Sequence, residues 1–410
     1  MPTKSKSKGD KPFEANTNGI FSGAFDTLTK GERWSAKAEL YVEKGSGKVR
    51  QAGAAQVEGE FVRKFKKICE QDLFAFLDGV LNYWFLQPEL HRPVCEWLTT
   101  IPPRRKLLLM PRNHGKSTIV GRGIPLHALI QPKDSNIYYP GHPGTHLRLV
   151  LAGETEARAI DHLRVIKSAL ADNVLLRALW PHACWDNPRK QAPTWSDTVI
   201  ICPRDVEFAE PTIRGIGVGG AITGSHPNML IKDDLTTEKA ANEPSTMAKA
   251  IEWHMDSRAL FANPDKDLEF ITGTRWAAFD LPGYVQDNDP TVEFNKDWRA
   301  VVNRDGKIIY PFKYGFEGAL QQLQTEHGVK FPFLFMNEIS GKDTTDFMIS
   351  DLRDYVLSGG VIKFQENMQD EELRLAVGKS EPDVQLERGM DLYTALNVGN
   401  MEYLRNTRSL

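Results

Sequence analysis

The chain has 410 residues, and at about 150 residues per domain this length favours two or three domains. Apolar residues make up 41% and charged residues 26%, so the chain can bury a sizeable core and is not disordered as a whole. A net charge of -3 excludes a uniformly basic protein that coats nucleic acid, but it is compatible with a local basic surface. The four cysteines lie far apart without a C-x-x-C pair, which argues against a disulfide framework and a zinc knuckle. No stretch reaches the roughly 18 consecutive apolar residues of a membrane helix, so we expect a protein of the cell interior that contacts no membrane.

The first 103 residues are predicted to hold a tail followed by helices. Residues 1–55 are rich in glycine, serine and lysine and show little apolar periodicity, which predicts a disordered tail. A solvated tail is the simpler interpretation of its lysines, and contact with nucleic acid is the alternative. Between 57 and 81, apolar residues recur every three to five positions, so residues 56–103 are expected to form a helical lead-in.

Residues 104–340 alternate between short apolar runs and longer amphipathic segments, one of which, 154–172, has a clear helical face. This alternation predicts an α/β domain with a mainly parallel sheet flanked by helices. The expected strands are 107–110, 147–152, 198–201, 229–231 and 269–272.

The remaining segments carry weaker signals. Asp305 and Gly306 lie between two short apolar runs and predict a hairpin turn. Residues 341–385 are largely polar and acidic towards their end, which predicts a linker or small subdomain.

The sharpest motif follows the first expected strand, where an apolar run leads into Gly115, Lys116 and Ser117. Backbone N–H groups at a helix N-terminus cradle phosphate oxygens, a lysine neutralises the outer phosphates and a hydroxyl holds Mg²⁺. The full pattern has glycine five residues before Gly115, where this chain has Met110. The tripeptide alone is also compatible with an ordinary helix start, and its context favours a nucleotide-binding loop. The predicted loop residues are Pro111, Arg112, Asn113, His114, Gly115, Lys116, Ser117 and Thr118.

An acidic pair, Asp233 and Asp234, follows the expected strand 229–231. A nucleotide-hydrolysing sheet needs one carboxylate near the phosphate loop for the metal and a second to orient the attacking water. The position before the first acid is usually apolar, and Lys232 departs from that, which leaves open which acid faces the metal. Taken alone, the pair also fits a helix-capping loop.

The expected strand 269–272 ends in a third motif, a group of polar residues that are candidate sensors of a γ-phosphate. In isolation the same residues also fit a strand that leaves the core through a threonine and glycine turn. The predicted coupling residues are Thr272, Gly273, Thr274 and Arg275.

Together these motifs resemble those of the large terminase subunits of tailed bacteriophages, the ATPases that drive DNA into a procapsid. The resemblance covers roughly residues 85–340 and, more faintly, 385–400. In that family the loop commonly lacks its first glycine and carries an arginine three residues before the second, as Met110 and Arg112 do here. The matching segments are 111–118, 214–226, 233–234, 272–276 and 310–311.

The resemblance implies ATP and Mg²⁺ as cofactors and assigns roles to the matched residues. Lys116 would bind the β- and γ-phosphates, and Arg112 would contact the γ-phosphate. Ser117 and Asp233 would hold Mg²⁺. Asp234 would stand where the family has a water-activating glutamate, which is one methylene longer.

Further roles follow from the same resemblance. Residues 272–275 would couple hydrolysis to DNA movement. Arg214 is a weaker candidate for an arginine supplied to a neighbouring subunit, which implies a homo-oligomeric ring. Gln87 is a candidate adenine contact, and a merely exposed glutamine is the alternative.

Family members also have a C-terminal nuclease domain of the ribonuclease H type, in which carboxylates hold two metal ions. Residues 386–410 resemble its opening strand, with Asp391 as the first metal ligand. Only one further acid, Glu402, follows Asp391, so the domain would be incomplete. We therefore expect no nuclease activity from this chain alone. An ordinary strand-end role for Asp391 is the alternative.

The resemblance implies double-stranded DNA, held through its phosphates, as a partner. It also implies a portal protein and a small terminase subunit, and action in the host cytoplasm, transiently at the portal of the procapsid. A helicase- or recombination-type DNA-dependent ATPase and an inactive truncated terminase fragment are the alternative functions.

Overall fold

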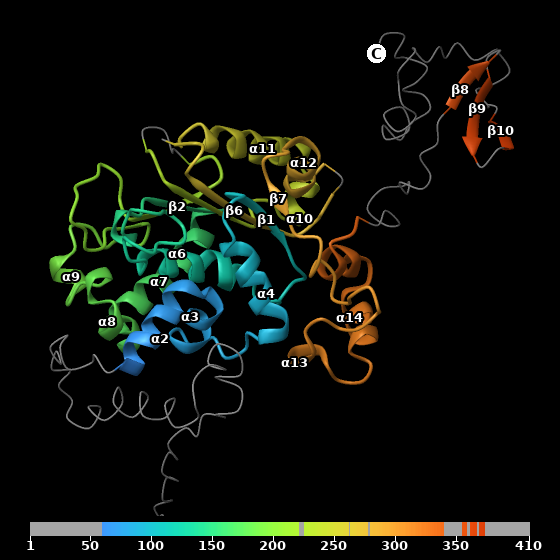
Figure 1. The fold of residues 1–410 in the computed structure, drawn as a ribbon. Coiled ribbons are helices and arrows are strands. Elements are labelled where there is room, and N and C mark those ends of the chain that lie inside the picture. The colour runs from blue at the N-terminus through green and yellow to red at the C-terminus, as the bar shows by residue number, and fades with distance from the viewer. Residues whose placement is uncertain are drawn as a thin grey trace, which may run out of the picture. The chain divides into compact units, whose positions relative to one another are not determined.

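The computed structural model divides into two compact units (Figure 1). It describes residues 60–220, 225–261, 263–277 and 279–339, and three strands within 355–373. The first unit reaches Glu326 and also takes in Phe333–Asn337, and the second contains His327–Pro332 and the three later strands. The predicted tail 1–55 and the segment 386–410 lie outside the described residues.

The described part of the first unit begins with three helices, which correspond to the helical periodicity of the sequence. The Asp72 side chain accepts a hydrogen bond from the backbone N–H of Ala75 (2.9 Å) and so caps the second of them. These helices are α2 (Glu60–Gln71), α3 (Leu73–Gly79) and α4 (Pro88–Thr99).

A seven-stranded sheet in the order β3-β4-β2-β5-β6-β1-β7 forms the centre of this unit. All neighbouring strands are parallel except β3 and β4. The fold is therefore α/β with a mainly parallel sheet flanked by helices, as the sequence predicts. The strands are β1 (Arg105–Leu109), β2 (Leu149–Gly153), β3 (Val199–Ile200), β4 (Ile213–Gly217), β5 (Met229–Asp233), β6 (Leu268–Gly273) and β7 (Glu293–Phe294).

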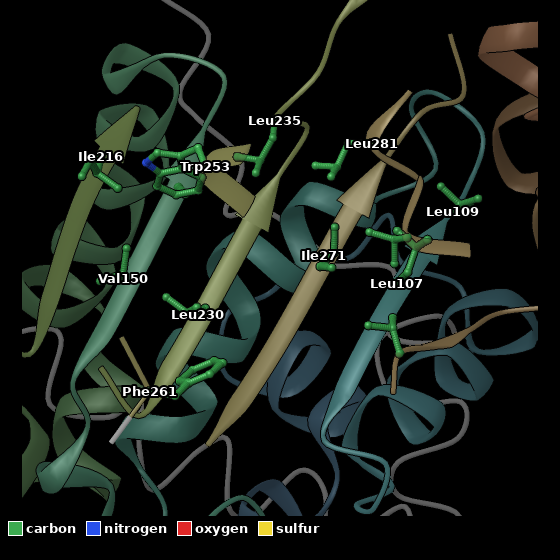
Figure 2. Packing of buried hydrophobic residues seen from close by; sticks show 13 residues of the cluster. Leu107, Leu109, Val150, Ile216, Leu230, Leu235, Trp253, Phe261, Ile271 and Leu281 are labelled. Carbon is green, nitrogen blue, oxygen red and sulfur yellow. The ribbon is translucent and has the colours of Figure 1, made fainter. Parts of the chain in front are cut away.

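One face of the sheet packs against α11 (Pro244–Arg258) and α12 (Leu281–Asn288). Side chains alternate between the two faces of a strand, so every second apolar residue joins this core. The cluster takes residues from five neighbouring strands, β4, β2, β5, β6 and β1. Figure 2 shows them together with Trp253 from α11 and Leu281 from α12. The strand residues in it include Leu107, Leu109, Val150, Ile216, Leu230 and Ile271.

The other face is covered by α7 (Glu156–Asp172) and by the segment that follows the phosphate loop. That segment runs through α5 (Lys116–Thr118), the π-helical turn η2 (Ile119–Gly123) and α6 (Ile124–Leu129). The remaining short helices are η3 (Gly144–His146), α8 (Val174–Leu179), η4 (Pro181–Ala183), α9 (Pro188–Gln191), α10 (Glu238–Ala241), α13 (Pro311–Tyr314), α14 (Ala319–His327), η5 (Gly328–Lys330) and η6 (Pro332–Met336). Within the described part of the chain, none of the helices is long and apolar enough to span a membrane.

Lys232, the departure noted in the sequence, belongs to a buried ionic cluster on the α11 side of the sheet. Its Nζ lies 2.5 Å from Oε1 of Glu269 on β6, and both side chains have no exposed surface. The second oxygen of Glu269 accepts a hydrogen bond from Nε of Arg258 (2.8 Å), and Arg258 also pairs with Asp289. A lysine before the acidic pair is therefore compatible with a buried strand, because its charge is paired across the sheet.

Two strands of the seven-stranded sheet, β4 and β7, were not predicted from the sequence, whereas one turn was predicted. Strand β4 contains two glycines in five residues, and β7 has only two residues, so neither shows an apolar run. The turn at Asp305 and Gly306 is present, with a single antiparallel bridge between Val302 and Ile308.

The second unit contains a three-stranded antiparallel sheet in the order β10-β9-β8. The predicted linker or subdomain at 341–385 thus includes regular strands. Their bounds are β8 (Tyr355–Ser358), β9 (Val361–Glu366) and β10 (Gln369–Leu373).

Buried neutral histidines predict a loss of stability in acid. Burial lowers the pKa of His127 to about 4, and its ring contacts the Tyr138 hydroxyl and the Cys69 carbonyl, each at 2.9 Å. Below the unfolded pKa of about 6.5, the unfolded chain binds a proton that the folded chain does not, so stability is lost as pH falls towards 4. We expect His127→Gln to reduce the pH slope of the unfolding free energy by about 1.4 kcal/mol per pH unit between about 6 and 4.5. Denaturant titrations across this range measure the slope, and identical slopes would contradict the prediction.

Candidate nucleotide site

The predicted phosphate loop, the acidic pair and the predicted coupling segment meet at the carboxyl edge of the sheet. Strand β6 lies between β1 and β5, with Leu109 paired to Gly273 and Asp233 paired to Thr272. Because parallel strands end at the same edge, three segments far apart in the sequence lie side by side there. This edge is where open α/β sheets bind their ligands.

The predicted phosphate loop, residues 111–118, runs from the end of β1 into α5. Gly115 is the N-cap of α5 at φ 84°, in the left-handed region that glycine adopts without strain. Met110, at the position of the missing first glycine, is fully buried, so a core side chain has replaced a loop residue there. The backbone N–H of the exposed Arg112 donates to the Leu334 carbonyl (2.7 Å), which fixes the start of the loop.

Lys116 joins the three segments. Its Nζ donates a hydrogen bond to Oγ1 of Thr274 (2.7 Å) and lies 3.6 Å from Oδ1 of Asp234. The lysine side chain is only 8% exposed, so its charge is confined to the pocket.

Asp233 is the last residue of β5 and is held from two sides. His162 of α7 contacts Oδ2 at 2.8 Å, and the Thr272 hydroxyl donates to Oδ1 at 2.5 Å. Burial alone would raise the pKa of Asp233, but the hydrogen bonds from His162 and Thr272 and the charges nearby hold it below its usual value. Asp233 is thus an ionised carboxylate with a fixed orientation.

Asp234 follows in the left-handed region, at φ 47°. Desolvation and the neighbouring Asp233 raise its pKa, and Lys116 opposes them. Oδ1 of Asp234 is buried and accepts no hydrogen bond from any residue that the structure describes, although Lys116 lies near it. A buried acceptor of this kind is a place where a ligand or metal-bound water would be favourable.

These residues line a pocket of about 280 Å³, with Ser117 and Trp276 on its wall. Five charged or titratable residues of the wall, four of them on or just before α7, were not predicted from the sequence. For Glu154, the available sequence signal was a polar residue directly after a buried strand. His162 gave no such signal, because it lies on the buried face of a helix, among apolar core residues. These residues are Arg122, Glu154, Arg158, Asp161 and His162.

His114 forms the aromatic side of the loop. Its ring stacks on Tyr314 with centroids 5.4 Å apart, and Tyr310 lies 5.3 Å away. Burial lowers the pKa of His114 to about 4, so the ring is neutral at pH 7. The carbonyl of His114 lies 3.1 Å from Nε2 of His91, which ties the loop to α4.

Some predicted site residues are not among those that line the pocket. Gln87 is the N-cap of α4, and its amide donates to the Trp84 carbonyl (3.3 Å). Arg214 lies near the amino end of β4, paired with Val150, and is partly buried. Arg275 donates to Asp280 (2.9 Å) beside α12. The predicted loop residues Asn113 and Thr118 do not line the pocket but are adjacent in the chain to Arg112 and Ser117, which do. Asp391 lies outside the described residues.

The side chains that line the pocket are of the chemical types that hold a nucleotide phosphate and Mg²⁺. Four cationic side chains face four carboxylates, and a hydroxyl from Ser117 follows Lys116 at the start of a helix. Lysine and backbone N–H groups bind phosphate oxygens, and carboxylate and hydroxyl oxygens suit Mg²⁺.

Comparison with known proteins gives a distant likeness among solved structures. No family model matches the chain, and no curated protein matches it. Among solved structures, it is similar to the large terminase of bacteriophage HK97, with a TM-score of 0.38 and 16% sequence identity. The aligned region covers 59% of this chain and 48% of the HK97 chain, so this chain spans about half the length of that terminase.

Proposed function

We propose that the chain is an ATP-hydrolysing motor of the terminase type, which moves double-stranded DNA into a procapsid. The observation that carries the ATPase proposal is the meeting of Lys116, Thr274 and Asp234 in one pocket beside the oriented Asp233. The more specific role in packaging rests on the motif resemblance at 111–118, 214–226 and 272–276.

The proposed chemistry is in-line attack of water on the γ-phosphorus, catalysed by positioning and charge stabilisation. Lys116 and Arg112 would stabilise the phosphate charge. Asp233 and Ser117 would hold Mg²⁺, which when bound neutralises phosphate charge. A pocket carboxylate other than Asp233 would orient the water, and Asp234 is the one that the sequence predicts.

The coupling proposal rests on the contact of Lys116 with Thr274, because a ligand phosphate on the lysine would change this hydrogen bond. Residues 272–275 would pass that change on to a DNA-gripping surface. A homo-oligomeric ring, an arginine supplied in trans by Arg214 and an adenine contact at Gln87 remain proposals from the resemblance. So do the portal and small-subunit partners, the site of action at the portal, and the start of a nuclease domain at Asp391.

ATP hydrolysis measured with and without double-stranded DNA tests this function, alongside binding of a fluorescent ATP analogue. We expect stimulation by DNA of unrelated sequences, without strand separation on a forked substrate. The stimulation should fall steeply from about 50 to about 200 mM salt, because contacts to phosphates release counterions. Strand separation would favour the helicase alternative, binding without hydrolysis an inactive fragment, and no nucleotide binding would contradict the proposal.

A further inference from the structure

Glu154 occupies the same level of the sheet as Asp234, one strand away. Strand β2 is the direct neighbour of β5, and Gly153 is paired with Asp233. Glu154 and Asp234 are the next residues on these two parallel strands, so both leave the sheet at its carboxyl edge. Both side chains line the pocket that holds Lys116.

The Glu154 carboxylate is held in place. Its Oε1 accepts a hydrogen bond of 2.6 Å from the Thr237 hydroxyl. Thr237 is the N-cap residue of α10, yet its side chain makes no cap hydrogen bond with that helix. The hydroxyl thus orients Glu154 instead of serving its usual capping role.

The Asp234 carboxylate, in contrast, lies beside Lys116. Its Oδ1 lies 3.6 Å from the Nζ of Lys116, the group expected to neutralise phosphate charge. A carboxylate at this distance from the ammonium group is placed to position the lysine. Aspartate is also one methylene shorter than glutamate.

We propose that Glu154 is a further catalytic residue, the carboxylate that orients the attacking water, while Asp234 positions Lys116. This inference rests on the proposed ATP hydrolysis. The water oxygen forms a bond to the γ-phosphorus, and the bond from that phosphorus to the β–γ bridging oxygen breaks. The electron pair of the broken bond leaves with ADP. The water proton passes to the Glu154 carboxylate and from there to solvent, which leaves ADP and inorganic phosphate.

The test compares Glu154→Gln and Asp234→Asn in the full chain, by single-turnover hydrolysis and by binding of a fluorescent ATP analogue. We expect Glu154→Gln to bind the analogue within about threefold of the native chain and to hydrolyse ATP about 10²–10⁴-fold more slowly, the usual range for general acid–base catalysis. Asp234→Asn should weaken binding more than Glu154→Gln does. Glu154→Asp keeps the charge and should recover part of the rate.

Glu156→Gln is the matched control, because Glu156 is an exposed acid in the first turn of α7 and does not line the pocket. If Glu154 acted only by stabilising the N-terminus of α7, both glutamine variants would behave alike, and this result would overturn the inference. Near-native hydrolysis by Glu154→Gln would also overturn it, and loss of hydrolysis in Asp234→Asn would then return the role to Asp234. Failure of the native chain to hydrolyse ATP would overturn the proposed function itself.

Discussion

Replacing Lys116 by alanine is expected to lower ATP hydrolysis by about 10²–10³-fold or more, as removal of one oriented charge-stabilising group does in other enzymes. Lys116 is buried, and its Nζ contacts both Thr274 and Asp234. In the pocket that the structure describes, no other cation lies at this position. Steady-state hydrolysis and binding of the fluorescent analogue measure the effect. Binding should weaken as well, because the lysine contacts the phosphates in both the ground and the transition state.

The matched control for Lys116 is Lys313→Ala. Lys313 lies on α13, with its Nζ 5.6 Å from the centre of the Tyr314 ring, and it is exposed outside the pocket. Its removal should leave hydrolysis close to the native rate. A Lys116→Ala chain that hydrolyses ATP at the native rate would refute the assignment of this loop to phosphate binding.

The second large effect is on stability. Glu269→Gln is expected to destabilise the fold by about 3–5 kcal/mol, because it leaves the buried Lys232 without its counter-charge and removes one of the two carboxylates that pair with Arg258. Burial alone would raise the pKa of Glu269, but Lys232 and Arg258 outweigh it and hold the pKa at about 2. The carboxylate therefore contributes stability above its unfolded pKa of about 4.3 and loses that contribution as pH falls towards 2.

Denaturant unfolding at pH 7 measures this change. Arg164→Gln provides the control, because Arg164 pairs with Asp161 on the surface with 70% of its side chain exposed. An exposed pair of this kind contributes at most about 1 kcal/mol. If the two variants lost similar amounts of stability, the buried cluster would not have the importance that its geometry indicates.

The strands next to the predicted phosphate loop could be predicted because each contains a short apolar run, which is typical of strands buried on both faces. Strand β4 was not, since its glycines carry no apolar signal even though Gly215 packs close to Ala159 of α7. The pairing of Lys232 with Glu269 joins residues 37 positions apart, and no local pattern reports such a pair.

The candidate site shows the same limit. Lys116 and the acidic pair carry local motifs, and the parallel sheet brings them to one edge. His162 lies among Ala159, Leu163 and Ile166 on the buried side of α7, where a histidine is usually part of the core. Only the three-dimensional arrangement shows that its ring reaches Asp233.

The two faces of strand β5 have a joint consequence for ligand binding. Lys232 fixes this strand to the layer of α11, and Asp233 fixes it to α7 through His162, so the end of the strand is held from both sides. The orientation of the Asp233 carboxylate is thus established when the chain folds, and a ligand that binds there loses little conformational entropy in arranging it.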